Sequence, residues 1–396
     1  MSSDLSNQDI VIVAAKRTPM GGFQGALATV ASPKLAATAI KGLMLHSGLA
    51  GEQVDEVLMG CVLPAGLGQA PARQATLGAD LPLSVGATTV NKVCGSGMKT
   101  VMLAHDLIKA GSANVVIAGG MENMSQAPYL LDKARGGMRM GHGKVLDHMF
   151  LDGLEDAYTG GAMGTFAQNT ADNFNLTREQ MDDFALSSLE KANAAIATGA
   201  FSREITPVTV ANRRGDVVVD TDEQPGNARP DKIPTLRAAF AKDGTITAAN
   251  SSSISDGAAA LMLMTRAQAS ELKLEVMATI KGHTTHAQEP SMFTTAPVGA
   301  MSKLLEKVSW SKDEVDLFEI NEAFAMVTML AMSELGLDAE KVNVNGGACA
   351  LGHPIGCSGA RLLVTLIHAL KARGLSKGVA SLCIGGGEAT AMAIEL

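Results

Sequence analysis

Thiols and one histidine are the side chains of this sequence that could carry nucleophilic and acid–base chemistry. Cys94 follows an apolar run and precedes Gly95 and Gly97, and apolar residues then recur with helical spacing from Met98 to Ile108. This pattern predicts that Cys94 lies at a strand-to-helix turn, where helix N–H groups and the helix dipole favour a thiolate and lower the thiol pKa. The two glycines would let a ligand approach the backbone closely. The alternative is a small, inert cysteine buried in strand–helix packing.

The C-terminal part of the chain contains three further chemical signals. A glycine-rich loop over residues 345–356 contains His353, and the segment 321–324 reads Asn-Glu-Ala-Phe directly after a predicted strand. Cys383 lies at another predicted strand end, just before three consecutive glycines. A thiol beside an imidazole is the arrangement of an activated sulfur nucleophile. A second thiol in the same site is a candidate acid or base.

The elements that must position these residues alternate between strands and helices. Continuous apolar runs at 10–15 and 114–120 indicate buried strands, and helical spacing at 34–49 and 71–77 indicates helices between them. This alternation predicts an α/β fold with a largely parallel sheet. Because 46% of the residues are hydrophobic but only 3% are aromatic, the cores must be aliphatic.

The two ends of the chain resemble each other. Val-Asp-Glu-Val at 54–57 matches Val-Asp-Leu-Phe at 315–318, and the small residues at 94–97 match those at 356–359, each time before a predicted helix. Both matches have nearly the same separation along the chain, which predicts a duplicated α/β half whose glycine-flanked turns converge. The loop-rich residues between the halves are interpreted as an insertion that covers a site, with a helix that Thr177 caps together with Gln180.

Composition and cysteine usage exclude several classes of protein. A formal charge of −8, without a block of Lys or Arg, argues against a nucleic-acid-binding surface. The five cysteines are odd in number and lack CxxC spacing, which argues against a disulfide framework or structural zinc and predicts a reducing, cytoplasmic environment. The sequence shows no signal or transit peptide, and no apolar run reaches the roughly 18–20 residues that span a bilayer. The remaining histidines show no metal-ligand spacing, so no metal site is predicted.

Four motifs in this sequence resemble the signatures of the thiolase family, in particular of its acetyl-CoA C-acetyltransferases. They are Asn-x-Val-Cys-x-Ser-Gly-Met-Lys at Cys94, Asn-Glu-Ala-Phe at Asn321, Asn-x-x-Gly-Gly-x-x-Ala-Leu-Gly-His-Pro-x-Gly at His353, and Cys-x-Gly-Gly-Gly at Cys383. The match runs from about residue 10 to 396 with the motifs in order.

The resemblance implies a particular fold. It implies duplicated βαβαβαββ halves in a five-layer αβαβα arrangement, with an inserted loop domain over the coenzyme A site. The first half would comprise residues 1–123 plus about 254–275, the loop domain 124–253, and the second half 276–396.

The resemblance also implies an activity and its residues. The expected reaction is the reversible Claisen condensation of two acetyl-CoA molecules, with coenzyme A thioesters as substrates and no cofactor. Cys94 would accept the acyl group, and His353 would activate Cys94 and help bind the thioester oxygen. Asn321 would hold a water at the same oxyanion site, and Cys383 would exchange the α-carbon proton. The N–H groups of Cys94 and Gly385 would form a second oxyanion hole, because preorganised donors at a developing charge supply much of the rate.

For coenzyme A the resemblance points to Ser252 and a set of pocket walls, with Arg229 or Lys232 at the phosphates. The predicted walls are Phe240, Ala248, Met163, Leu154, Ala323 and Phe324. Ordinary core packing is the alternative for the two phenylalanines, and a helix cap is the alternative for Ser252. Ala162 replaces a histidine that many short-chain members have, so a broader or longer-chain 3-ketoacyl-CoA thiolase is the alternative activity.

Residues 133–143 resemble the loop through which tetrameric members join two dimers, so a homotetramer is predicted, with a dimer as the alternative and a merely solvated loop also considered. Glu388, after the triple glycine, has no assigned role. A ketoacyl synthase or a silent acyl-CoA-binding protein on the same fold are competing functions, and Cys383 together with the intact motif set argues against both.

Overall fold

The computed structural model of the protein describes residues 7–396. The first half begins with β1 (Ile10–Arg17), which is buried along nearly its whole length because its apolar run suits a strand covered on both faces. The half continues with α2 (Ser32–Ser47), β3 (Glu56–Gly60), α3 (Pro71–Gly78), β4 (Gly86–Val90), α4 (Ser96–Lys109), β5 (Val116–Asn123) and, after the insertion, β10 (Ser255–Thr265). This is the predicted βαβαβαββ order. The short β2 (Gly21–Gly22) pairs with the start of β10.

The second half follows α8 (Arg266–Glu271) and repeats most of this order. Its elements are β11 (Ala278–Ala287), α9 (Ala296–Val308), β12 (Leu317–Ile320), α10 (Ala325–Leu335), α11 (Ala348–Leu351), α12 (Ser358–Arg373), β13 (Lys377–Ile384) and β14 (Glu388–Glu395). The counterpart of β4 is only an isolated parallel bridge between Phe318 and Val342.

The strands of both halves join into one sheet in the order β12-β13-β14-β11-β1-β10-β5-β3-β4. The halves meet where Val11 and Ile12 of β1 pair with Thr279 and Ala278 of β11. Along this order, β3 runs parallel to β4 and to β5, and β12 runs parallel to β13. The other neighbouring strands in this order are antiparallel. The prediction of a largely parallel sheet is therefore wrong. Strands joined through a helix run parallel, whereas β13 and β14 are joined by a tight turn, which makes them antiparallel.

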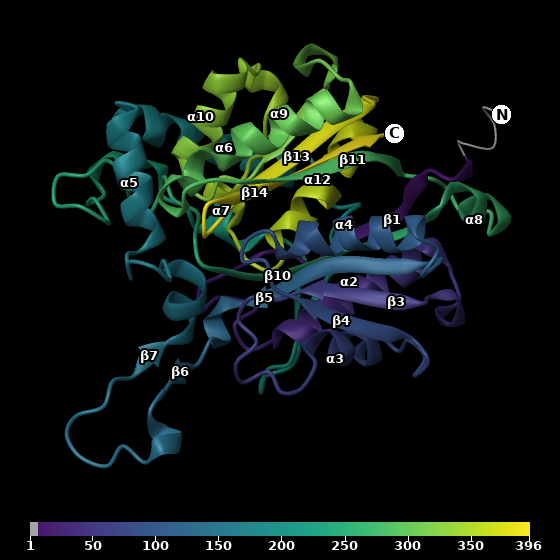
Figure 1. The fold of residues 1–396 in the computed structure, drawn as a ribbon, viewed down its shortest axis with the longest axis horizontal. Helices are drawn as coiled ribbons and strands as arrows, with labels where there is room; N and C mark the ends of the chain where they lie inside the picture. Colours follow the sequence, from purple (N-terminus) through teal and green to yellow (C-terminus); the bar gives the residue numbers. More distant parts are fainter. Residues whose placement is uncertain (1–6) are drawn as a thin grey trace.

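Helices and the two parts of the sheet stack in five layers (Figure 1). α2 and α3 pack on the outer face of the first half, α4 and α12 lie between the halves, and α9, with α10 beside it, covers the second half. The core between the halves is aliphatic, with Met98, Val101, Leu362 and Leu366 buried in it. The αβαβα arrangement predicted from the resemblance is thus confirmed.

The two helices of the central layer touch at their first turns. A Cβ atom added to Gly359 would lie 2.4 Å from the backbone nitrogen of Met98, and one added to Gly97 would lie 2.8 Å from that of Ala360. Since real Cβ atoms do not approach backbone atoms so closely, glycine is required at both positions. The convergence of the duplicated turns, predicted from the repeat, is confirmed at this contact.

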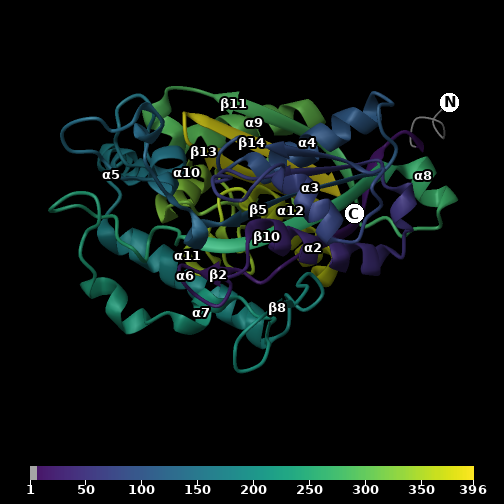
Figure 2. The same ribbon diagram turned by 90° about the horizontal axis from the view of Figure 1, so that it is seen from below.

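The insertion between β5 and β10 consists of short elements and two longer helices. They are β6 (Tyr129–Leu130), β7 (Leu146–Asp147), a π-helical segment (Phe150–Leu154), α5 (Met163–Asn173), α6 (Arg178–Ala197), β8 (Val208–Val210), β9 (Val217–Val219) and α7 (Glu223–Asn227). The capping box of Thr177 and Gln180 begins α6, as predicted. Figure 2 shows α6, α7 and β8 along one side of the two halves. Among the described residues, no helix has both the length and the apolarity that a membrane crossing requires.

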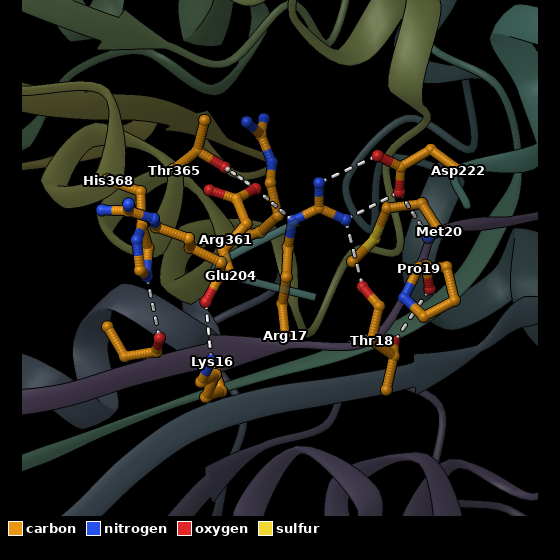
Figure 3. A network of polar contacts seen from close by, with 12 residues as sticks. Lys16, Arg17, Thr18, Pro19, Met20, Glu204, Asp222, Arg361, Thr365 and His368 are labelled. Atoms are coloured by element: carbon orange, nitrogen blue, oxygen red, sulfur yellow. Dashed lines mark hydrogen bonds and ion pairs between the residues drawn. The ribbon is translucent and has the colours of Figure 1, made fainter. Parts of the chain in front are cut away.

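Arg17, at the end of β1, anchors the insertion (Figure 3). Its buried guanidinium contacts Glu204 Oε1 at 2.5 Å and both carboxylate oxygens of Asp222 at 2.7 and 2.8 Å. It also lies over the ring of Phe201, 4.9 Å from the centroid. Thr365 of α12 donates to the same oxygen of Glu204 at 3.2 Å. The network therefore joins the insertion to both halves.

Candidate active site

One cavity brings together residues of both halves and of the insertion. It has a volume of about 370 Å³, and Cys94, His353, Cys383 and Gly385 line it. Of the residues predicted to bind coenzyme A, the following also line it: Leu154, Met163, Phe240, Ala248, Ser252, Ala323 and Phe324.

Two groups of predicted site residues lie elsewhere. Asn321 is buried behind His353 and does not line the cavity. Arg229 directly precedes the 3-10 helix Pro230–Thr235, and Lys232 lies within that helix. Both residues are exposed, and neither lines the cavity. Their contact with phosphates stays a prediction.

Cys94 lies at the predicted turn between β4 and α4. The preceding Val93 has a φ of 46°, a strained conformation for a β-branched residue that costs about 1–3 kcal/mol. Local hydrogen bonds hold it. The Val93 N–H donates to Asn91 Oδ1 at 2.9 Å, and Ser96 Oγ accepts from the Lys92 N–H at 2.8 Å and donates to the Val93 carbonyl at 2.6 Å. The turn thus holds the sulfur in a defined place at the cavity wall.

The electrostatics of Cys94 differ from the expectation drawn from its helix. Burial raises the pKa of the Cys94 thiol to about 11, although the backbone N–H groups of Gly385 and Cys94 itself oppose this by hydrogen bonding. The residue keeps some solvent exposure, but protein atoms surround its sulfur closely enough for desolvation to dominate. The expectation that the helix terminus lowers this pKa is therefore wrong, and the resting group is a thiol that needs a base.

We expect the alkylation of Cys94 by iodoacetamide to accelerate with pH and not to level off below about pH 10, because the thiolate fraction rises roughly tenfold per pH unit below the pKa. Timed quenching and mass spectrometry of the peptide that contains Cys94 would measure the rate separately from the other thiols. A plateau below about pH 8 would contradict the raised pKa and restore the stabilised thiolate.

His353 is held in one tautomer and is neutral. Its Nδ1 lies 2.5 Å from Ser358 Oγ, and that hydroxyl donates to the Pro354 carbonyl at 3.0 Å. Ser358 must therefore accept from Nδ1–H, so Nε2 is unprotonated and its lone pair can act as a base. Burial, with a smaller effect of the Arg361 charge, lowers the pKa of His353 to about 3. On the Nε2 side the Asn321 amide nitrogen lies at 3.4 Å.

Cys383 and Gly385 come from the end of β13 and the turn after it. Burial raises the pKa of the Cys383 thiol, and the charge of a nearby Cys94 thiolate would raise it further. The Gly385 N–H donates to the Cys94 sulfur. Both predicted thiols and both predicted oxyanion donors thus lie around one point of the cavity.

Gly95 and Gly97 serve the packing of the two halves. A Cβ atom on Gly95 would lie 2.3 Å from the side chain of Ile384, and Gly97 faces the start of α12. The prediction that these glycines open the backbone to a ligand is wrong. They allow the second half to approach closely enough to place Cys383 and His353 beside Cys94.

Two buried carboxylates position the loop that contains His353, and the sequence reasoning assigned neither. Glu322 accepts from the Cys349 N–H at 3.0 Å and from the Ser188 hydroxyl at 2.8 Å. Glu122 accepts from the Gly356 N–H at 3.0 Å. The adjacency of Glu322 to Asn321 in the Asn-Glu-Ala-Phe motif was the available signal, whereas Glu122 had none beyond its place at a strand end.

The predicted coenzyme residues form an apolar wall with one ordered hydroxyl. Phe240 packs edge-on against Phe324, with ring centroids 6.2 Å apart. Phe240 is 37% exposed, so the alternative of an ordinary core residue is wrong for it. The Ser252 hydroxyl donates to the Ala323 carbonyl at 2.9 Å and caps no helix.

Glu388 gains a structural explanation. Its carboxylate forms an ion pair with the Lys92 ammonium, so it ties the turn after the triple glycine to the turn before Cys94. Both side chains keep partial exposure, so the pair orients the turns more than it stabilises the fold.

Known proteins are similar to this chain in sequence and in fold along nearly its whole length. The model of the thiolase N-terminal domain matches residues 10–267, and that of the thiolase C-terminal domain matches residues 274–396. Proteins named acetyl-CoA acetyltransferase from Pseudomonas aeruginosa and Cupriavidus necator are each 50% identical, over 98% of this chain and 99% of their own. The crystal structure of the Bacillus anthracis acetyl-CoA acetyltransferase superposes with a TM-score of 0.95 at 43% identity, covering 98% of each chain.

These matches agree with the five-layer fold and with the four motifs, whose residues meet in and behind one cavity. The protein is a member of the thiolase family.

Proposed function

We propose that this protein is an acetyl-CoA C-acetyltransferase, which condenses two acetyl-CoA molecules reversibly into acetoacetyl-CoA and free coenzyme A. The observation that carries the proposal is the meeting of Cys94, neutral His353 and Cys383 in one cavity with an apolar wall. The names of relatives at 50% identity support it. Coenzyme A thioesters are the substrates in this proposal, and the reaction draws on no separate cofactor.

In the first half of the reaction His353 Nε2 takes the Cys94 proton as the sulfur attacks the acetyl carbonyl. The C–S bond to coenzyme A breaks, the proton passes from His353 to the leaving sulfur, and acetyl-Cys94 remains. The raised thiol pKa makes such a base necessary, and the lowered pKa of His353 keeps the base unprotonated at neutral pH.

In the second half Cys383, as a thiolate, takes the α-carbon proton of a second acetyl-CoA. The resulting enolate, stabilised by a water that Asn321 holds, attacks acetyl-Cys94. The N–H groups of Cys94 and Gly385 stabilise the oxyanion until the C–S bond to Cys94 breaks. The departing Cys94 thiolate then takes the proton that Cys383 removed, so both sulfurs return to their starting states. In thiolysis the steps reverse, and burial favours the protonated Cys383 that this direction uses to protonate the leaving enolate.

The proposed experiment is a steady-state assay of acetoacetyl-CoA thiolysis with free coenzyme A, repeated with longer 3-ketoacyl-CoA substrates. A ping-pong pattern of parallel double-reciprocal lines and a preference for the four-carbon substrate would support the proposal. Ala162, where many short-chain members have a histidine, lines the cavity, so the same assay tests the alternative of a broader or longer-chain thiolase. A flat or rising chain-length profile would select that alternative, and no thiolysis of any substrate would overturn both.

Ser358 provides a specific prediction, because its hydroxyl accepts the hydrogen bond from His353 Nδ1–H at 2.5 Å and so favours one tautomer. We expect Ser358→Ala to lower kcat about tenfold with little change in KM, since one buried hydrogen bond contributes about 0.5–1.5 kcal/mol. Ser302→Ala, on the exposed side of α9, is the matched control. An increase in KM at constant kcat would contradict a role in orienting the base.

We further propose a cytoplasmic homotetramer, built as a dimer of dimers. The β6–β7 hairpin projects away from the body (Figure 1) and carries exposed apolar side chains, with Met140 97% and Tyr129 68% exposed. This surface supports assembly through residues 133–143, and light scattering of the purified protein would give the mass. The five free cysteines support a reducing compartment.

A further inference from the structure

Three potential metal ligands from different halves meet on the side of the central layer away from the cavity. His105 and Asp106 lie on α4, and His283 lies on β11. Asp106 Oδ1 is 2.9 Å from His105 Nδ1 and 3.0 Å from His283 Nε2, and the two ring nitrogens are 3.3 Å apart. The three ligand atoms therefore form a compact triangle, although His283 is far from His105 and Asp106 in the sequence.

The triangle has the size of one face of a tetrahedral metal site. Bonds of about 2.0–2.1 Å to nitrogen and oxygen at tetrahedral angles place neighbouring ligand atoms roughly 3.3 Å apart. The two imidazole rings are edge-on, with centroids 5.0 Å apart and planes at 83°, so both nitrogens can face a common point without the rings clashing. A hydrogen-bonded cluster alone would account for the Asp106 contacts, but it does not require the two ring nitrogens to approach each other.

The donor set of the cluster suits a divalent cation, because two imidazole nitrogens and one carboxylate oxygen lie close enough to share one ion. Both imidazoles are mostly buried and Asp106 is half-exposed, which leaves one side open to solvent.

We propose that His105, Asp106 and His283 bind one divalent zinc-type ion per chain, with a water in the fourth position. Two imidazoles and one carboxylate are ligands that Zn²⁺ takes when a site keeps an open position. His105 follows the first residue of α4 by nine positions, so the site lies about 14 Å along the helix from the Cys94 turn. The ion would fasten α4 to β11, and so one half of the duplicated fold to the other, without entering the acyl-transfer chemistry.

Zinc binding to the full-length protein tests this proposal. Equilibrium dialysis against Zn²⁺ at about pH 7.5 would be compared among the wild type, His105→Gln, His283→Gln and the control His142→Gln, whose histidine is exposed on the insertion. We expect one ion per chain in the wild type and control. We expect at least about 100-fold weaker binding in the other two, because even outer-shell losses cost roughly 10–100-fold. Zn²⁺ should also raise the Tm of the wild type and control only.

Two further measurements keep the result decisive. The Tm of each variant in chelator, compared with the wild type, shows that it is folded before zinc is added. The competing metal ligands are the thiols of Cys94 and Cys383. Co²⁺ is therefore used in place of Zn²⁺, because its absorption spectrum distinguishes ligation by histidine and carboxylate from ligation by thiolate. Absence of saturable binding in the wild type would overturn the proposal. So would binding that is unchanged in both variants, or a thiolate spectrum.

Discussion

Cys94→Ser is expected to lower the rate of acetoacetyl-CoA thiolysis by roughly 10³-fold or more, which is the scale seen when a covalent nucleophile is removed. A serine hydroxyl is close in size to the thiol but ionises far less readily, so neutral His353 would deprotonate it poorly. The same change should abolish the covalent acetyl group that acetyl-CoA leaves on the protein. Mass spectrometry of the intact chain, after brief exposure to acetyl-CoA, measures that loss directly.

Cys349→Ala is the matched control, because Cys349 is also a partly exposed free thiol but lies outside the cavity lining. It should keep both the acetyl adduct and the activity. Acetylation that persists in Cys94→Ser at an unrelated residue would remove the assigned nucleophile. Acetylation that is lost while thiolysis survives would exclude the covalent intermediate.

Arg17→Met is expected to lower the free energy of unfolding by about 3–5 kcal/mol. This is the largest effect on stability that we expect from substituting one buried residue. The substitution preserves much of the side-chain volume but leaves Glu204 and Asp222 buried without their shared cation. The penalty comes from those uncompensated carboxylates more than from the lost attraction. Denaturant unfolding at a fixed protein concentration measures it, because oligomer stability depends on concentration.

Lys41→Met is the control for this change. Lys41 also pairs with a carboxylate, Asp80 at 2.8 Å, but both side chains are exposed by half or more. An exposed pair of this kind contributes about 0–1 kcal/mol. Limited proteolysis adds a local readout, since loss of the Arg17 network should expose the insertion around Glu204 to cleavage before the rest of the chain. If the free energy of unfolding of Arg17→Met lies within about 1 kcal/mol of the wild-type value, the network does not anchor the insertion.

Local sequence patterns predicted the elements and the motifs of this protein well. The apolar run of β1, the capping box at Thr177 and the turn at Cys94 each depend on neighbours within a few residues, so they can be read along the chain. The repeat predicted that the turns of the two halves converge, because two copies of one unit bury their shared apolar faces against each other. The resemblance that the four motifs carry then predicted 11 of the 23 residues that line the cavity.

The features that needed the tertiary structure depend on partners far apart in the sequence. The direction of β10 and β14 follows from where the chain re-enters the sheet, which periodicity does not report. The role of Glu388 required its contact with Lys92, and the tautomer of His353 required the orientation of Ser358. The network of Arg17 joins residues about two hundred positions apart.

The sequence by itself determined the fold class and the family resemblance, and it predicted which side chains react, because these are recorded in residue types at short spacing. Only the tertiary structure decided their protonation, since the pKa of Cys94 depends on how much protein surrounds the sulfur, and burial there outweighs the helix terminus. It also decided which distant side chains share a site. His105 and His283 show no ligand spacing along the chain, yet packing of α4 against β11 brings their nitrogens within 3.3 Å.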